Sequence, residues 1–340
     1  MPKIQQILLE KVDLKLTRPY TSAFKTVDHV ENAIVRIILD NGIVGYGAGN
    51  PSEQVVGENL NQSMSALEKA VSGSDQLGWP GLLGRDIEAL DQLCEEIQHH
   101  LPNSPSARTA LEVGLYDCLA QCQGKPLAVF LGQQHHSMPT SITIGIKGVQ
   151  ETLDEASEYY HRGFRYLKVK LGNNLQEDVE RVIKIREQFA EEVKIRVDAN
   201  QGYTVDELQK FYHETINADL ELIEQPLPVG QEEQMRSLPA EVRKLLAADE
   251  SLISPSDGVR LIAEAPACGI FNIKLMKCGG LTQALKISSL AENADIDLMW
   301  GCNDESIISI TAALHLAFAC KNTKYLDIDF SMDFAEEVVY

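Results

Sequence analysis

Three carboxylates follow short apolar runs in the middle of the chain. Asp198 stands in "KIRVDAN", Glu224 in "LELIEQP" and Asp249 in "RKLLAADES". Any one of them alone would more often be a surface acid or a helix cap, but an uncompensated carboxylate beside a buried run is costly. Three converging oxygen ligands suit Mg²⁺, a hard ion that leaves coordination positions for water and substrate. We therefore expect the three residues to hold one Mg²⁺ per subunit.

Lysines occur in the same kind of position on either side of the carboxylates. Lys168 and Lys170 of "RYLKVKLG" share one face of an expected strand, and Lys274 lies in "IFNIKLMKCGG". A solvated lysine face is the plain alternative, since lysine is rarely buried without a partner. Next to a divalent cation and a second ammonium, however, the pKa of a lysine falls and the amine can act as a general base. Two bases on opposite sides of one carbon allow a 1,1-proton transfer with inversion, with the metal stabilising the enediolate.

The spacing of these run ends predicts the elements that position them. Lys170, Asp198, Glu224, Asp249, Lys274, Cys302 and Asp327 follow one another at intervals of 25 to 28 residues. That interval suits one strand and one crossover helix, and eight such units make a (β/α)8 barrel whose active site lies at the carboxyl ends of the strands. "TSITIGI" would be the first strand. A doubly wound open sheet is the alternative, but the glycines of "GYGAGN" are in the wrong register for a phosphate loop and are better read as turn glycines.

The chain before the barrel has a different pattern. "IQQILLEKVDLKL" and "ENAIVRIILD" are typical of strands, and Asn41-Gly42 predicts a hairpin turn into "IVGYGAG". Helical spacing follows and is clearest over residues 107–124. We therefore predict an α+β capping domain over residues 1–125 and the barrel over residues 126–340.

Composition limits the classes of protein. Fifty acidic against thirty basic residues give a net charge of −20 over 340 residues, which argues against a nucleic-acid or anionic-membrane partner. The seven cysteines form no CxxC pair, so a zinc site or a disulfide framework is not expected. The start, "MPKIQQILLEKVDLKL", lacks the apolar core of a signal peptide, and we expect a cytoplasmic protein. Whether it forms a homo-oligomer is left open.

The motifs resemble those of a known family. "KVKLG", "DANQGY", "EQP", "ADES" and "KLMKCGG" look like the successive strand-end motifs of the enolase superfamily, in its muconate-lactonising subgroup. The resemblance implies that Asp198, Glu224 and Asp249 bind magnesium. It also implies that Lys170 and Lys274 are the acid/base pair and that Lys168 lies near the substrate carboxylate. Lys277 does not match the catalytic position and is expected to be structural or exposed.

The eighth strand end distinguishes between reactions within that subgroup. Asp327 and Asp329 of "YLDIDF" share a strand face, and two carboxylates that do not bind metal call for a cation. Dipeptide epimerases of the family carry such an Asp-x-Asp pair to hold the α-ammonium group of the substrate. The resemblance thus implies a dipeptide epimerase; an N-acylamino-acid racemase or o-succinylbenzoate synthase is the alternative, and a solvated strand end is the plain one. A Schiff-base aldolase and a non-catalytic ligand-binding barrel are more remote.

Side-chain specificity is less clear from the sequence. "MWGCNDESIIS" resembles the stretch that lines the dipeptide side-chain pocket, with Cys302 and Asp304 as candidates and Asn303 as a departure from the family pattern. Lys25 lies where Ala-Glu epimerases place a basic residue that grips glutamate. Asp304, Glu53 and the net charge favour a cationic or broad-range dipeptide instead, with the Ala-Glu substrate close behind.

Overall fold

The computed structural model describes residues 1–21, 26–74, 78–336 and 338. The first of its two sheets is antiparallel, with the order β1-β2-β3. Its strands are β1 (Ile4–Thr21), β2 (Thr26–Leu39) and β3 (Val44–Gly49). The predicted turn joins β2 to β3: Gly42 has a φ of 85° and Asn41 Oδ1 accepts the Ile43 amide at 3.1 Å.

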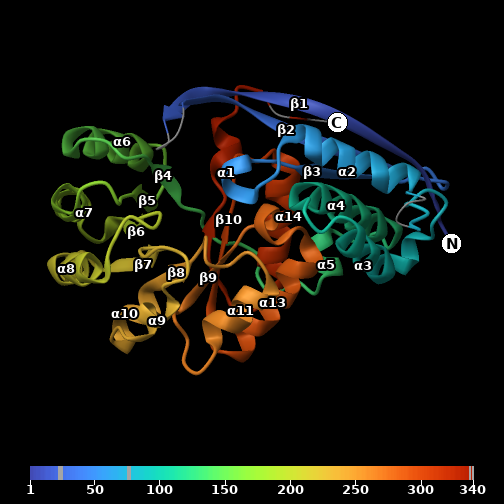
Figure 1. The fold of residues 1–340 in the computed structure, drawn as a ribbon. Coiled ribbons are helices and arrows are strands. Elements are labelled where there is room, and N and C mark those ends of the chain that lie inside the picture. The colour runs from blue at the N-terminus through green and yellow to red at the C-terminus, as the bar shows by residue number, and fades with distance from the viewer. Residues whose placement is uncertain (22–25, 75–77, 337, 339–340) are drawn as a thin grey trace.

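Five helices follow this sheet in the described part of the chain, and the first four form the N-terminal domain with it (Figure 1). They are α1 (Glu53–Val56), α2 (Leu60–Ser72), α3 (Leu90–His100), α4 (Pro105–Cys122) and α5 (Leu127–Phe130), with a short 3-10 helix at Ile87–Ala89. The "GYGAGN" glycines lie within strand β3, so reading them as turn glycines is wrong. They let α4 pack directly on the strand: a Cβ on Gly47 would come within 1.8 Å of the Ala110 carbonyl oxygen.

The second sheet has eight parallel strands in sequential order, β4 to β11. They are β4 (Ile142–Ile144), β5 (Tyr166–Lys170), β6 (Lys194–Asp198), β7 (Leu220–Glu224), β8 (Leu246–Ala248), β9 (Ile270–Ile273), β10 (Asp297–Gly301) and β11 (Thr323–Asp327). A parallel bridge between Thr140 and Leu326 joins the two edges, and Ser141 N donates to Leu326 O at 3.1 Å. The predicted (β/α)8-type barrel, with its strands at the predicted runs, is confirmed.

Helices separate the barrel strands and surround them. They are α6 (Val149–His161), α7 (Leu175–Phe189), α8 (Val205–Thr215), α9 (Glu232–Arg236), α10 (Ala240–Leu245), α11 (Pro255–Ile262), α12 (Leu275–Cys278), α13 (Leu281–Asn293) and α14 (Ile307–Ala319), with 3-10 turns at Ala190–Glu192, Ile216–Ala218 and Phe330–Asp333. Figure 1 shows α6, α7 and α8 on the side of the barrel away from α2, α3 and α4. None of the described helices combines the length and apolar character needed to cross a membrane.

Strand register brings the run ends to one level. Lys170, Asp198 and Glu224 are successive Cα partners across β5, β6 and β7. Because parallel strands place their carboxyl ends at one edge, these residues face a common space, which we call the barrel mouth.

The N-terminal domain contacts the barrel at several places, among them the start of α12 and the segment after β11. On α4, Thr109 Oγ1 donates to Leu275 O at 2.9 Å, at the start of α12. After the last strand, the chain returns to β1: Phe334 bridges Leu16, and Ala335 N donates to Lys15 O at 2.8 Å. The barrel is therefore held to the N-terminal domain both after β9 and after β11.

Candidate active site at the barrel mouth

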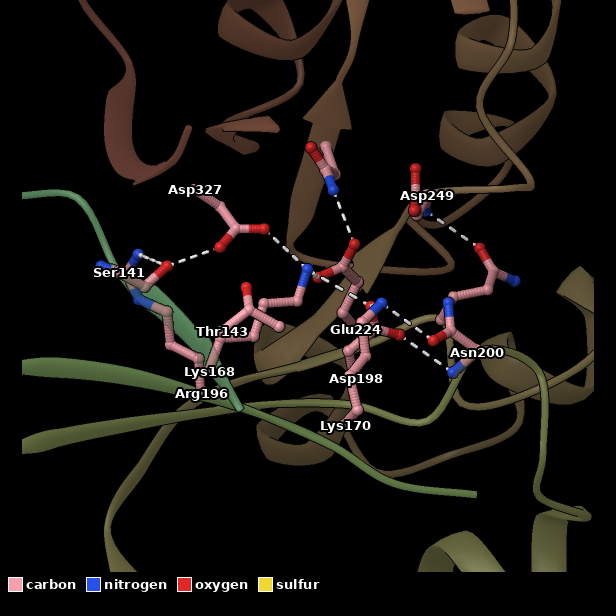
Figure 2. Close-up of polar contacts among 12 residues, drawn as sticks. Ser141, Thr143, Lys168, Lys170, Arg196, Asp198, Asn200, Glu224, Asp249 and Asp327 are labelled. Atoms are coloured by element: carbon pink, nitrogen blue, oxygen red, sulfur yellow. Dashed lines mark hydrogen bonds and ion pairs between the residues drawn. The ribbon is translucent and has the colours of Figure 1, made fainter. Parts of the chain in front are cut away.

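Lys168 lies at the centre of the barrel mouth and is 3% exposed. Its Nζ is 2.6 Å from Asp327 Oδ2, 2.7 Å from Glu224 Oε2 and 3.3 Å from Asp198 Oδ2 (Figure 2). Burial acts to lower the pKa of Lys168, but the charges of these carboxylates outweigh it and raise the pKa well above its usual value. A solvated lysine face is therefore the wrong interpretation of this strand, because Lys168 points into the barrel.

Lys170 lies two residues further along β5, at the rim of the mouth. Its Nζ is 2.6 Å from Asp198 Oδ2 and 2.9 Å from Asn200 Oδ1. The Lys170 side chain is 30% exposed, against 3% for Lys168. The two lysines share a strand face, as predicted, but one is enclosed and the other can reach a molecule in the mouth.

Lys274 and Lys277 meet one carboxylate on the other side of the mouth. Lys274 Nζ is 2.9 Å from Asp249 Oδ2, while Lys277 Nζ contacts Asp249 Oδ1 and lies 2.6 Å from the Asp249 carbonyl oxygen. Lys277 is 4% exposed, so of the two expectations for it the structural one is correct and the exposed one is wrong.

The predicted lowering of the Lys274 pKa does not follow from the charges of the protein. Burial lowers this pKa, but Asp249 and Glu224 together raise it above its usual value. The prediction depended on a divalent cation among the carboxylates, and the side chains by themselves act in the opposite direction.

The three carboxylates are buried, and their charges affect one another. Asp198 and Glu224 are 0% exposed and Asp249 is 3% exposed. Burial, followed by the charges of Asp198 and Asp249, raises the pKa of Glu224 to about 8. Glu224 Oε2 is buried and, although 2.7 Å from the Lys168 ammonium, makes no hydrogen bond of good geometry. An all-oxygen donor set of this charge fits a hard divalent cation such as Mg²⁺.

Ammonium groups occupy the oxygens that such an ion would need. Lys170 contacts Asp198, Lys168 contacts Glu224 and Lys274 contacts Asp249. Accordingly, no group of three histidine, cysteine or acidic side chains in the described part of the chain is already arranged to hold a metal ion. The donors match the ion in kind, and each of the three carboxylates is at the same time paired with a lysine ammonium.

Asp327 and Asp329 lie on the remaining side of the mouth, and both are buried. Asp327 Oδ1 accepts from Ser141 Oγ at 2.6 Å, and Asp329 Oδ2 accepts the Thr143 amide at 2.8 Å. Burial and the neighbouring Asp327 charge raise the pKa of Asp329 to about 7. The solvated strand end is therefore the wrong interpretation: these are buried carboxylates near Lys168.

The specificity candidates are more scattered. Cys302 Sγ donates to Asp327 O at 3.5 Å, and Asp304 is half-buried in the loop after β10. Glu53 is the exposed first residue of α1, where its carboxylate accepts from Asn59 Nδ2 at 2.9 Å, and α1 contacts α12. Lys25 lies outside the described residues.

Two polar residues of the barrel interior were missed by reasoning from the sequence. Asn272 is buried and donates from Nδ2 to Glu224 Oε1 at 2.7 Å; it precedes Lys274 by two residues, so strand periodicity could have found it. Arg196 precedes Asp198 by two residues and donates to Ser141 Oγ at 3.3 Å. Ser141 in turn donates to Asp327, so Arg196 is linked to Asp327 through the Ser141 hydroxyl.

Comparison with known proteins places the chain among enzymes of similar architecture. Residues 4–132 match the mandelate racemase / muconate lactonizing enzyme N-terminal domain, and residues 151–340 match the enolase C-terminal domain-like family. The L-Lys-D/L-Arg epimerase of Methylococcus capsulatus is 48% identical over 99% of this chain and 92% of its own length. The L-Lys-D/L-Arg epimerase of Desulforapulum autotrophicum is 47% identical over 99% of this chain and 93% of its own.

Solved structures agree with these matches. The dipeptide epimerase of Methylococcus capsulatus complexed with Mg and the dipeptide L-Arg-D-Lys superposes with a TM-score of 0.93 at 48% identity, covering 99% of this chain and 93% of that one. The Enterococcus faecalis dipeptide epimerase complexed with Mg and L-Leu-L-Tyr gives a TM-score of 0.91 at 32% identity, covering 99% of this chain and 93% of that one. With both domains matched over nearly their full length, this chain belongs to the mandelate racemase / muconate lactonizing enzyme family of the enolase superfamily.

Proposed function

We propose that this protein is a magnesium-dependent dipeptide epimerase that inverts the α-carbon of the C-terminal residue of its substrate. The observation that carries the proposal is the placement of Lys170 and Lys274 on opposite sides of three buried carboxylates. Lys170 contacts the first of them and Lys274 the last. A substrate α-carbon between the two amines would expose one face to each, as a two-base inversion requires.

Each residue of the mouth has a proposed role. Asp198, Glu224 and Asp249 hold Mg²⁺, which when bound supplies positive charge next to the substrate carboxylate. Lys170 and Lys274 exchange the α-proton. Lys168, whose charge the surrounding carboxylates maintain, neutralises the substrate carboxylate. Residues 1–125 act as the capping domain and residues 126–340 as the catalytic barrel.

Asp327 and Asp329 are the proposed site for the α-ammonium group of the dipeptide. They are 5% and 7% exposed, so a substrate ammonium would meet them with little competing water. An N-acylamino acid has no such ammonium. This pair therefore favours a dipeptide over an N-acylamino-acid racemase substrate.

For the side chains, we propose a cationic dipeptide. The two relatives at 47% and 48% identity are L-Lys-D/L-Arg epimerases. Asp304, in the loop after β10, and Glu53, at the start of α1, supply negative charge. The net charge of −20 acts in the same direction. L-Ala-D/L-Glu is the second candidate, because an L-Ala-D/L-Glu epimerase of Clostridium acetobutylicum is 33% identical over 96% of this chain.

The test is deuterium incorporation in D₂O with Mg²⁺, read by mass spectrometry over a dipeptide library. We expect label at the α-carbon of the C-terminal residue, fastest with lysine- and arginine-containing dipeptides. Fastest labelling of Ala-Glu would overturn the cationic preference, and labelling of N-acylamino acids alone would overturn the dipeptide reading.

Asp327→Asn tests the ammonium site directly. It should raise KM for dipeptides by about tenfold or more, because it removes a charge-assisted contact. Asp297→Asn is the matched control, since Asp297 lies at the start of β10, away from the barrel mouth, and pairs with Lys324 at 2.8 Å. An unchanged dipeptide KM in Asp327→Asn would contradict the proposed site.

A further inference from the structure

Residues 275–282, which we call the junction segment, run from Lys274 into the first turn of helix α13 and lie against the N-terminal domain. Lys274 precedes the segment directly, and its carbonyl oxygen accepts the amides of Lys277 at 3.1 Å and Cys278 at 3.2 Å. The Gly279 amide donates to Leu275 O at 2.8 Å. The backbone of Lys274 is thus tied by short hydrogen bonds to the segment that follows it.

A buried glutamate of the other domain reaches the end of this segment. Glu112, on α4, is 0% exposed, and its Oε2 accepts the Thr282 amide at 2.8 Å. Helix α13 begins after Gly280, which has no side chain to cap the first turn. Glu112 therefore does what a capping side chain would do, from a different domain: its oxygen accepts an amide of the first helical turn, while burial raises the pKa of its carboxyl above the usual value.

The residues around the Glu112 carboxylate favour this contact. Gly280 has a φ of 120°, and a Cβ there would lie 2.5 Å from Glu112 Oε2, so a side chain would push the carboxylate away. Gln98 Nε2, on α3, donates both to Glu112 Oε1 at 3.2 Å and to Gly279 O at 2.9 Å. Thr109 donates to Leu275 O at 2.9 Å at the start of the segment, and Glu112 accepts the Thr282 amide at its end. The N-terminal domain therefore holds the segment at both ends.

We propose that Glu112 is a positioning residue for Lys274: it fixes the junction segment against the N-terminal domain and thereby sets where the Lys274 amine lies. This rests on the proposed function, in which Lys274 serves one face of the α-carbon and Lys170 the other. Lys170 lies on β5 and forms hydrogen bonds with Asp198, Asn200 and Arg181, all in the barrel. Loss of Glu112 should therefore impair one face of the reaction and spare the other.

The experiment measures exchange of the α-proton in D₂O separately from each of the two epimers of a dipeptide substrate. Lys274→Ala identifies the epimer whose proton Lys274 removes, because only the opposite epimer should still exchange. We expect Glu112→Ala to slow exchange of the Lys274 epimer by about tenfold or more, since small displacements of a reacting group are costly. Exchange of the other epimer should change less than about threefold.

Two further variants separate positioning from general destabilisation. Thr109→Val removes the hydroxyl that donates to Leu275 O and to Pro105 O within α4, and it should give the same one-sided loss, also where Glu112→Ala folds poorly. Glu112→Gln keeps an oxygen acceptor for the Thr282 amide and should recover part of the lost rate. Glu96→Gln is the matched control: it breaks the Arg85 ion pair of the N-terminal domain without touching the junction segment, and should slow neither epimer selectively.

Each outcome decides the matter. One-sided losses in Glu112→Ala and Thr109→Val support the positioning role, particularly if amides of residues 275–282 also lose protection in hydrogen exchange. Equal losses for both epimers, or none, overturn the role of Glu112 and leave the proposed function standing. A wild-type protein that exchanges no dipeptide would refute the proposed function and this role with it.

Discussion

The two lysines that flank the carboxylates are held in different ways. Lys170 is 30% exposed and bonds to Asp198 and Asn200 within the barrel. Lys274 is 13% exposed, and the segment that follows it is held by α3 and α4 of the N-terminal domain. Barrel residues alone contact Lys170, whereas we propose that the position of Lys274 also depends on the N-terminal domain.

Removal of either amine should have the largest effect. Lys170→Ala and Lys274→Ala should each reduce epimerisation by about a thousandfold or more, because a positioned acid/base group contributes roughly 10² to 10⁴. The measurement is the rate of change in optical rotation from each epimer. Substantial turnover in either variant would show that the substituted lysine is not one of two required acid/base groups.

Removal of magnesium should act equally on both sides. Chelation with EDTA should slow α-proton exchange from both epimers by more than about a hundredfold, since a bound ion supplies several kcal/mol of charge stabilisation. Restored exchange on adding Mg²⁺ is the control. If EDTA slowed only one epimer, the carboxylates would not serve both lysines in common.

A substitution on the Lys274 side of the mouth should lower the free energy of unfolding more than one on the Lys170 side. Lys277→Met breaks a buried contact with Asp249 and should lower the free energy of unfolding by about 3 kcal/mol. Asn200→Gly, on the Lys170 side, should cost less than about 1 kcal/mol, because glycine adopts the positive φ of 42° at this position and the partly exposed Lys170 keeps Asp198. Urea unfolding checks both values. Comparable losses would mean that the two sides are equally tightly built.

Acid should weaken the N-terminal domain by a small amount. The hydrogen bonds from Arg85 hold the pKa of Glu96 at about 2, against 4.5 in the free side chain. A lowered folded-state pKa contributes stability at pH values above 4.5, and this contribution is lost as the pH falls from 4.5 towards 2. The urea midpoint of wild type should therefore fall more between pH 5 and pH 3 than that of Glu96→Gln. Equal falls would exclude this ion pair as the cause.

Much of the barrel was predictable from local patterns. The interval of 25 to 28 residues located the strand ends, because each strand and crossover helix needs about that length. Strand periodicity placed Lys168 and Lys170 on one face, and the register brings Lys170 beside Asp198 as expected. These predictions depend on short-range geometry, which the sequence records directly.

Contacts between distant segments were not predictable in the same way. Glu112 lies on a helix that is buried on nearly every side, and its partner Thr282 is 170 residues away. The burial of Lys277 depends on Asp249, in a different βα unit. The direction of the Lys274 pKa depends on the balance between burial and two carboxylates, which needs distances. Sequence patterns indicate which residues are charged, but not which neighbours they meet.

The bridge between Thr140 and Leu326 has a consequence for how the protein is made. The strand that closes the barrel is translated after the seven strands it completes, and Asp327 leaves the ribosome after all residues of the proposed metal and acid/base set. At about 5 to 20 residues per second, β4 waits roughly 10 to 40 seconds for its partner β11. During that interval the nascent barrel has two open edges, so a chaperone that shields β4 would protect the chain most in that period.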